Sequence, residues 1–427
     1  MNTPVRTVVA GGGPGGMLLA YLLARAGLPV TLLERHHDFD RDFRGDSLHP
    51  WTLELLDRLG LAGRLLEQPH IKARQFRFRT PRGLVPTSDY GLLDTPYNYV
   101  ALMPQARFLD FLAAEAATLE TFELRTGAGV SGLLGTGTAD DPVRGVRLRD
   151  GEEIPAGLVV AADGRFSKIR GLAGLTAQSQ GATTDLLWFA LPQYATDPPD
   201  ADVDLFFGER HYVGLLGGPV PAADPPDPRV TGRWQVGLSL PKGGYAELRE
   251  RGVEYVRREV GTRVPWLADR TALLPDLSAA TLLSVDISRV PVWHRAGLLL
   301  IGDAAHVISP VGGNGILMAC QDALAAADRL VPALRGGGVP GPDVLAAVQA
   351  DREPAIVTVQ DQQVRVERTV ARARERGRPV TPPSFLRLLT RIPAVRKRSA
   401  RRNAYGPVPV RPSAELERAL RLGPPPA

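Results

Sequence analysis

A glycine-rich turn near the N-terminus constrains this chain more than any other feature. The apolar run Thr7–Ala10 leads directly into Gly11–Gly16, with the sequence GGGPGG, and a helical pattern follows. The spacing satisfies G-x-G-x-x-G between a strand and a helix, the context in which this motif binds a dinucleotide. Gly11 permits the tight turn, Gly13 lets backbone approach a phosphate, and Gly16 lets helix and strand pack closely.

The residues after the turn complete a dinucleotide-binding unit. A helix is predicted over Met17–Ala26, where its N-terminus offers free N–H groups to the pyrophosphate. A second strand, Val30–Leu33, ends in Glu34, 18 residues past the last glycine of the motif. A carboxylate there accepts hydrogen bonds from a ribose 2′-OH and repels a 2′-phosphate, which favours FAD or NAD over NADP as the bound cofactor. His36 and His37 predict no metal site, because adjacent side chains splay apart.

Two further apolar runs repeat the design of the first strand. Leu158–Ala162 and Leu298–Ile301 each run directly into a loop that contains glycine and aspartate. Strands that are uniformly apolar are typical of a parallel sheet buried on both faces. The sequence therefore predicts an α/β fold with a Rossmann-like domain.

The rest of the chain has a different pattern of residue types. Asp185–Leu240 alternates aromatic and aliphatic residues between proline-rich breaks at 192–199 and 219–228, which predicts antiparallel strands. We interpret this region as the substrate-binding part. Helices are predicted from Asp322 to Ala333 and from Pro342 to about Arg376, and an irregular tail after the break at 379–383.

Charge and cysteine content limit the class of protein. The net charge is +5, but residues 361–412 hold 14 Lys and Arg against three acids. We interpret this run as a solvated face, since no nucleic-acid motif accompanies it. The one cysteine, Cys320, excludes a disulfide framework, and no run approaches the roughly 18 apolar residues of a membrane span. We expect a cytoplasmic protein without a membrane span or a nucleic-acid partner.

Two aspartate motifs follow the second and third apolar strands. Asp163–Arg170 reads D-G-x-x-S-x-x-R, and Gly302–His306 reads G-D-A-A-H before the glycine-rich stretch Ser309–Gly315. In this order and spacing the three motifs resemble the FAD-dependent aromatic monooxygenases of the para-hydroxybenzoate hydroxylase type. The chain departs from that pattern at Leu317, where many relatives carry asparagine.

The resemblance implies a role for particular residues. Asp303 would hydrogen-bond the ribityl chain of FAD, and Asp163 would lie near the pyrophosphate. Arg44 would lie over the cofactor phosphates, Gln105 would contact FAD, and Pro310 would border flavin and substrate. The cofactor-binding residues predicted on all these grounds are Gly11, Gly13, Pro14, Gly15, Gly16, Glu34, Arg35, Arg44, Gln105, Asp163, Gly302, Asp303, Pro310, Gly312, Gly313, Asn314, Gly315 and Ile316.

The family's chemistry would then be expected here. NADPH or NADH docks transiently and reduces the flavin, O₂ adds at C4a, and the hydroperoxide hydroxylates an aromatic, phenolic or polyketide-like small molecule. No catalytic acid or base follows from the sequence. His211, Tyr212 and Pro310 are the pocket candidates.

Several alternatives stay open. A FAD-dependent reductase, or another flavin oxidoreductase acting on an apolar small molecule, shares the same cofactor motifs, and a non-catalytic nucleotide-binding protein would share the first of them. A halogenase is disfavoured because the tryptophans form no W-x-W-x-I-P motif. A monomer or homodimer is expected. The predicted division is 1–75, 97–180 and 283–345 for the FAD-binding domain, 76–96 and 181–282 for a substrate-binding β-sheet domain, and 346–427 for a C-terminal helical region and tail.

Overall fold

The fold is taken from a computed structural model that describes residues 5–40, 46–198, 203–208, 211–220, 228–310, 312–378 and 384–426. Its helices are α1 (Pro14–Arg25), α2 (Pro50–Arg58), α3 (Ala62–Leu66), α4 (Gln105–Ala116), α5 (Lys168–Leu172), α6 (Tyr245–Arg251), α7 (Val253–Arg263), α8 (Gly315–Arg335), α9 (Pro342–Glu375), α10 (Ser384–Leu389), α11 (Pro393–Tyr405) and α12 (Ala414–Leu420). Within the described ranges, no helix is both long enough and apolar enough to cross a bilayer.

A six-stranded sheet forms the first half of the molecule. In spatial order its strands are β20 (His294–Arg295), β21 (Leu298–Leu300), β12 (Leu158–Ala161), β1 (Thr7–Ala10), β2 (Val30–Leu33) and β8 (Phe122–Arg125). The pairs from β21 to β8 are all parallel, and β1, β2, β12 and β21 are buried along their whole length. The three apolar runs therefore lie together, as the sequence predicts. Helix α1 begins at Pro14, earlier than expected, because proline suits the first helical position.

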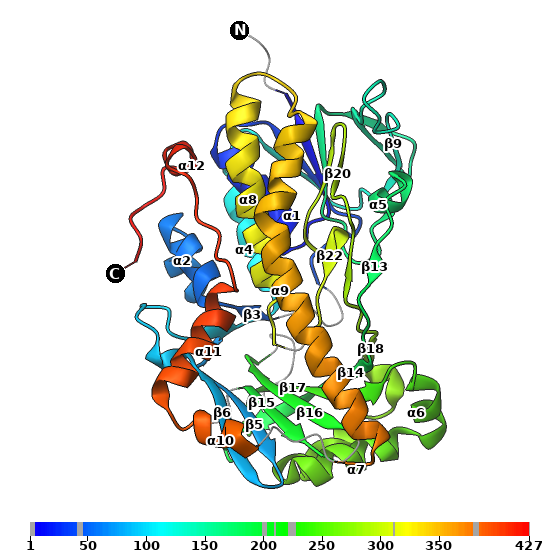
Figure 1. Cartoon of the computed structure of the whole chain (residues 1–427), viewed down its shortest axis with the longest axis vertical. Coiled ribbons are helices and arrows are strands. Elements are labelled where there is room, and N and C mark those ends of the chain that lie inside the picture. The colour runs from blue at the N-terminus through cyan, green and yellow to red at the C-terminus, as the bar shows by residue number, and fades with distance from the viewer. Residues whose placement is uncertain are drawn as a thin grey trace.

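A seven-stranded sheet forms the second half (Figure 1). In spatial order its strands are β18 (Thr281–Leu283), β14 (Thr184–Tyr194), β17 (Val230–Pro241), β16 (Tyr212–Gly218), β15 (Val203–Phe207), β5 (Gln75–Thr80) and β6 (Gly83–Asp89). All neighbours are antiparallel except β15 and β5. One face, with Trp234 and Val236, packs against α7, while the other faces the first half of the molecule. The predicted α/β class with a mainly antiparallel second sheet is confirmed.

Three small sheets of three strands connect and flank these halves. They are β3 (Ser47–Leu48), β7 (Val100–Leu102) and β4 (Ile71–Ala73); β11 (Glu153–Pro155), β10 (Gly145–Leu148) and β9 (Val130–Leu133); and β13 (Gln178–Ser179), β19 (Ser288–Arg289) and β22 (His306–Val307). The exact domain boundaries predicted above stay a prediction.

The predicted break at 192–199 is wrong at its start, where the chain is still a strand. Pro192 lies inside β14, opposite Arg233 of β17, and the strand continues to Tyr194. The carbonyl of Pro192 accepts a hydrogen bond from Arg270 at 3.2 Å and so points away from β17. Because the nitrogen and the carbonyl of one residue in an antiparallel strand point to the same side, the proline nitrogen also faces away from β17. Proline therefore removes no hydrogen bond of the β14–β17 ladder.

The tail is more regular than expected. Residues 379–383, the predicted break, lie outside the described residues, but α10, α11 and α12 follow them. Helix α11 packs beside β6, where Ser399 hydrogen-bonds Ser88 at 2.8 Å. Its buried Ala400 and Ala404 join a core cluster with Tyr90 and Leu93. The arginine-rich sequence of α11 has no wide apolar stripe, which is why its pattern did not indicate a helix.

Helix α9 connects the two halves through polar side chains (Figure 1). Gln360 donates to the carbonyls of Ser288 at 2.8 Å and Val307 at 2.9 Å. About two turns further on, the Glu367 carboxylate accepts from the Thr183 hydroxyl at 2.7 Å, beside the start of β14. These bonds fix α9 along strands that lead to the site described next.

Candidate active site

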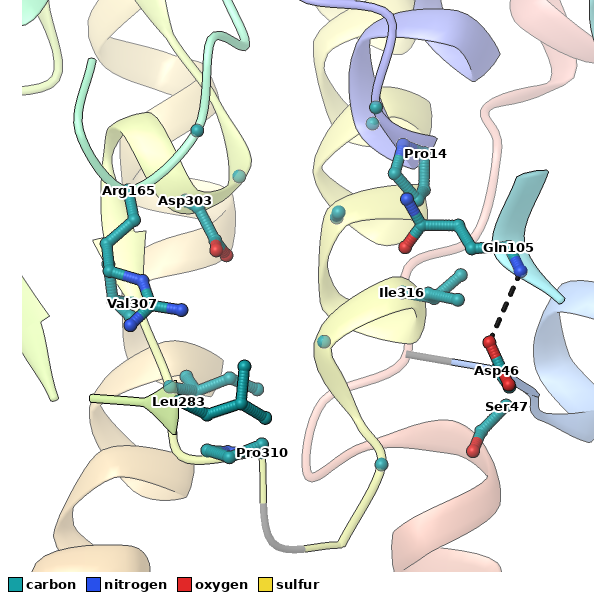
Figure 2. A pocket seen from close by; sticks show the side chains of 18 of the residues that line it. Pro14, Asp46, Ser47, Gln105, Arg165, Leu283, Asp303, Val307, Pro310 and Ile316 are labelled. Atoms are coloured by element: carbon teal, nitrogen blue, oxygen red, sulfur yellow. Dashed lines mark hydrogen bonds between the residues drawn. The ribbon is translucent and has the colours of Figure 1, made fainter. Parts of the chain in front are cut away.

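One large cavity lies between the two halves. Its volume is about 680 Å³, within the range of small-molecule sites. Its walls come from the carboxyl ends of β1, β2 and β12, from the start of α8, and from the inner face of the seven-stranded sheet. Figure 2 shows Asp303 and Arg165 on one side of the cavity, with Pro14, Gln105 and Asp46 on the other.

The glycine turn has the shape of a phosphate cradle. A Cβ added at Gly11, whose φ is +112°, would lie 2.3 Å from the carbonyl oxygen of Ala162, and one at Gly16 would lie 2.0 Å from that of Gly11. A Cβ at Gly13 would meet nothing within 4 Å. Two glycines therefore pack against backbone, while the third leaves open space at the N-terminus of α1. This geometry fits a pyrophosphate approaching the unpaired N–H groups of α1.

Glu34 lies beyond the turn, at the end of β2. Its carboxylate accepts hydrogen bonds from the backbone N–H of Gly12 at 2.9 Å and of His36 at 3.0 Å. These bonds hold the carboxylate at the cavity wall, where it would meet the ribose of an adenosine half. Exposed Arg35 lines the same end.

The two aspartate motifs are held by different means. Asp163 accepts from the Ser167 hydroxyl at 2.5 Å and from the N–H of Ile169 at 3.2 Å, which fixes the loop before α5. Burial raises the pKa of Asp163, against the lowering effect of these hydrogen bonds. Arg170 joins this loop to the other motif by donating to the carbonyl of Ala304 at 3.0 Å.

A buried ionic cluster holds the Gly302-Asp303 turn. Asp322 of α8 accepts from the N–H of Gly302 at 2.9 Å, from His306 at 2.6 Å and from Arg352 of α9 at 2.7 Å. Burial alone would raise the pKa of Asp322, but His306 and Arg352 together lower it to about 2. The backbone of the turn is thereby fixed while Asp303 stays exposed to the cavity.

The glycine-rich start of α8 lies against β3 and α2. A Cβ on Gly313 would lie 2.9 Å from the Ser47 hydroxyl, and the Gly313 carbonyl is 3.2 Å from Nε2 of His49. Burial lowers the pKa of His49 to about 4, despite this hydrogen bond, so the neutral ring donates to the carbonyl. Asn314, the N-cap residue, makes no side-chain cap, and Leu317 is fully buried in the core.

Asp46 is a site residue that the sequence did not single out. It is 9% exposed, lines the cavity, and accepts from the N–H of Gln105 and from Arg233, both at 3.3 Å, and from the Gln235 side chain. Burial raises the pKa of Asp46 to about 7, although Arg233 and the Gln105 N–H lower it. Its side-chain partners lie 187 and 189 residues away along the chain, so no local pattern could predict them.

The inner face of the seven-stranded sheet is mainly apolar around two opposed glycines. Gly214 and Gly237 are directly opposed on β16 and β17, and Trp188 is opposite Gly237 on β14. A Cβ on Gly237 would lie 2.5 Å from Cζ3 of Trp188, so the missing side chain lets the indole lie low over the sheet. Tyr212, one of the pocket candidates, lines this face, and its role stays a prediction.

The structure does not bring every predicted residue to the cavity. His211 is not among the lining residues: its Nδ1 is 2.5 Å from the Ser239 carbonyl and its Nε2 is 2.9 Å from the Tyr255 hydroxyl. Asn314 is likewise absent from the lining, and Arg44 lies outside the described residues. The predicted residues that do line the cavity are Gly11, Gly13, Pro14, Gly15, Gly16, Glu34, Arg35, Gln105, Asp163, Tyr212, Gly302, Asp303, Pro310, Gly312, Gly313, Gly315 and Ile316.

Together the parallel sheet, the phosphate cradle, the ribose carboxylate and the distant Asp303 turn define a FAD-binding oxidoreductase. The profile of the family described as FAD binding domain matches residues 4–363. The chain is 35% identical to a 6-methylpretetramide 4-monooxygenase of Streptomyces rimosus over 413 residues, covering 96% of this chain and 94% of that protein. It is 30% identical to a rifampicin monooxygenase of Streptomyces venezuelae, covering 83% and 69%.

A solved structure shows the same fold. The p-nitrophenol 4-monooxygenase of Pseudomonas putida superposes with a TM-score of 0.73 at 21% identity, covering 95% of this chain and 100% of that one. The chain belongs to the FAD binding domain family, among the FAD-dependent aromatic monooxygenases of the para-hydroxybenzoate hydroxylase type.

Proposed function

We propose that this protein uses NADPH or NADH and O₂ to hydroxylate a planar, polycyclic, phenolic small molecule. The observation that carries the proposal is the continuity of the cavity. It joins the FAD cradle to the inner face of the seven-stranded sheet at Gly214 and Gly237, which we call the glycine floor. The relatives act on 6-methylpretetramide and on rifampicin, as their names state. These names support a multi-ring substrate for this chain.

The floor favours a flat ligand. Gly214 and Gly237 add no side chains, and Leu186, Trp188 and Leu216 supply the surrounding apolar surface. A fused aromatic system would gain from burial against this surface and from stacking with the indole. A small single ring would leave much of the floor uncovered.

The chemistry that FAD supplies when bound is transfer of a hydride equivalent from NAD(P)H and of one oxygen atom from O₂, the second oxygen leaving as water. The protein would orient and dehydrate the reactants. Asp303 would hold the ribityl chain, and the N–H groups at the start of α8, near Gly315 and Ile316, would stabilise negative charge on the reduced ring.

The rim of the cavity suits a transient nicotinamide cofactor. Phe166 is 84% exposed and lies between Arg165 and Lys168, all three lining the rim. Arginine and lysine attract phosphate groups, and an exposed aromatic ring is a common contact surface. We therefore assign NAD(P)H docking to this rim.

The test uses purified FAD-loaded protein and a panel of hydroxylated naphthalenes, anthraquinones and naphthacenes. Oxidation of NADPH and of NADH is followed with and without each compound, peroxide is measured, and products formed under ¹⁸O₂ are weighed by mass spectrometry. Stimulated oxidation with one ¹⁸O atom in the product is expected. A colourless protein that takes up no FAD, or a product reduced without gain of ¹⁸O, would overturn the proposal.

A further inference from the structure

An exposed apolar stripe lies on the short helix α10 and on the turn that follows it. Phe385, Leu388 and Leu389 are 64%, 66% and 41% exposed, and Ile392, in the turn before α11, is 49% exposed. The first three are spaced as residues on one face of a helix. Large apolar side chains that lie together in water mark a contact surface. The stripe is therefore expected to be covered by a partner.

The tip of the β5–β6 hairpin extends this stripe. Helix α10 lies beside the hairpin (Figure 1), and a Cβ placed on Gly83 would lie 3.1 Å from Nη2 of Arg387. Arg387 also contacts the carbonyl of Arg82, 305 residues away along the chain. Leu84, on the same tip, is 46% exposed. The two segments form one surface, which we call the α10 patch: Leu84, Phe385, Leu388, Leu389 and Ile392.

Positive charge accompanies the α10 patch. Residues 384–402 contain seven Arg and Lys and no acid. Lys397 is paired with Asp94 at 2.7 Å. Arg396 is 3.7 Å from Asp89. The other five basic residues have no acidic partner within the described ranges, and they are Arg387, Arg391, Arg398, Arg401 and Arg402. This excess of positive charge favours an anionic partner.

The combination of apolar and basic side chains favours a lipid surface among anionic partners. A second copy of this chain would bring the same positive charge against itself. A strongly acidic protein face would satisfy the arginines but would offer little apolar area to the exposed side chains. An anionic bilayer offers both, because its headgroups attract Arg and Lys while its acyl boundary accepts Phe, Leu and Ile.

We propose that the α10 patch binds the surface of an anionic lipid bilayer. The apolar side chains enter the boundary between headgroups and acyl chains, and the arginines bind lipid phosphates. Such binding needs no membrane span, and the described part of the chain holds no helix that could form one. The part of the basic run next to α10 is then a docking surface rather than only a solvated face.

The hairpin that carries the patch also leads to the cavity. Phe76 of β5 lines the cavity, and the centroid of its ring is 5.8 Å from that of Phe78. Phe78 lies two residues before the end of β5 and packs edge-on against Phe207 at 5.0 Å. An aromatic cluster therefore extends from the cavity toward the tip. A bilayer-bound protein would meet an apolar multi-ring substrate where it accumulates, and only this consequence rests on the proposed function.

Flotation with lipid vesicles tests the proposal without turnover. FAD-loaded full-length protein is mixed with vesicles of phosphatidylcholine alone, or of phosphatidylcholine and phosphatidylglycerol in equal amounts, and the bound fraction is measured against lipid concentration. The anionic vesicles should bind about tenfold or more tightly than the neutral ones. Binding should weaken about fivefold or more when NaCl is raised from about 0.1 to 0.5 M, because salt screens the charges.

Two variants and two matched controls separate the patch from overall charge. Leu388→Ser and Arg391→Glu should each weaken binding to anionic vesicles about fivefold or more. Val339→Ser, in the loop between α8 and α9, and Arg418→Glu, on α12, also change exposed side chains and should bind like wild type. That loop and α12 lie far from α10 (Figure 1). FAD content and thermal unfolding, measured for each variant, should equal those of wild type.

Each contrary outcome is distinct. Wild-type protein that binds both kinds of vesicle alike, or neither, overturns the proposal, as do patch variants that bind like wild type or controls that lose binding equally. Self-association that Leu388→Ser abolishes, without vesicle binding, overturns it in favour of a second copy. Binding to polyglutamate but not to vesicles overturns it in favour of an acidic protein. The ¹⁸O₂ experiment contains no lipid, so failure of the proposed function is distinguishable from failure of this inference.

Discussion

The two variants Gly13→Ala and Gly16→Ala should separate cofactor binding from folding. The backbone of Gly13 has φ −69° and ψ 176°, which alanine adopts freely, and its added Cβ would meet no protein atom within 4 Å. The free protein should fold normally, with a gain of about 0.4–1 kcal/mol from the stiffer unfolded chain. The methyl group would instead occupy the phosphate cradle. Loss of one charge-assisted hydrogen bond, about 1.5–3 kcal/mol, weakens FAD binding roughly 10- to 150-fold.

Gly16→Ala should behave in the opposite way. Its Cβ would lie 2.0 Å from the backbone oxygen of Gly11, so α1 must move away from the turn. Overpacking of this kind costs about 1–3 kcal/mol. Thermal unfolding of FAD-free protein and titration of FAD, followed by quenching of flavin fluorescence, measure both quantities. Gly13→Ala protein that binds FAD within threefold of wild type, or FAD-free Gly16→Ala protein that is as stable as wild type, would contradict these expectations.

Three further predictions concern packing and charge. In Arg352→Met, the buried Asp322 carboxylate loses its arginine partner, which should lower the free energy of unfolding, measured with denaturant, by about 3–5 kcal/mol. The stability of Arg352→Lys should lie closer to that of wild type. Gly237→Ala should force Trp188 upward into the cavity and weaken 2-hydroxyanthraquinone binding about tenfold, while FAD affinity stays unchanged. Asp46 has a folded pKa of about 7, above its ordinary 3.8, so its ionisation in the folded state opposes folding increasingly as pH rises between these values. The stability advantage of Asp46→Asn over wild type should therefore grow by about 2–3 kcal/mol from pH 5 to pH 8. An advantage that stays constant over this range would contradict the raised pKa.

The parts of the site that could be predicted from sequence are those whose contacts are local. The unit from Thr7 to Glu34 carries its strand, turn, helix and carboxylate within one short segment, and each signal constrains the next. The Asp163 and Asp303 motifs were recognised for the same reason, since each lies directly after a buried strand. The FAD-binding fold followed from these segments, and the structure brings their ends to one cavity.

The parts that could not be predicted depend on distant pairing. Asp46 and Gln235 are 189 residues apart, and only the packing of two separate sheets brings them together. The sequence predicts both His211 and Tyr212 as pocket residues, although neighbouring residues in extended chain point to opposite faces. Which of the two faces inward depends on which side of the sheet α7 covers, and the sequence pattern leaves that open.

Helix α9 has a consequence for how such an enzyme can change its preferences during evolution. Its 34 residues span about 50 Å, and it is bonded to Asp322 behind the flavin-side turn and to Thr183 at the start of β14. A helix anchored at these two points, Arg352 and Glu367, keeps the distance between the Gly302-Asp303 turn and the sheet constant. New substrates would then be accommodated by exchanging single side chains on the floor, at positions such as Gly214, rather than by moving one half of the molecule against the other.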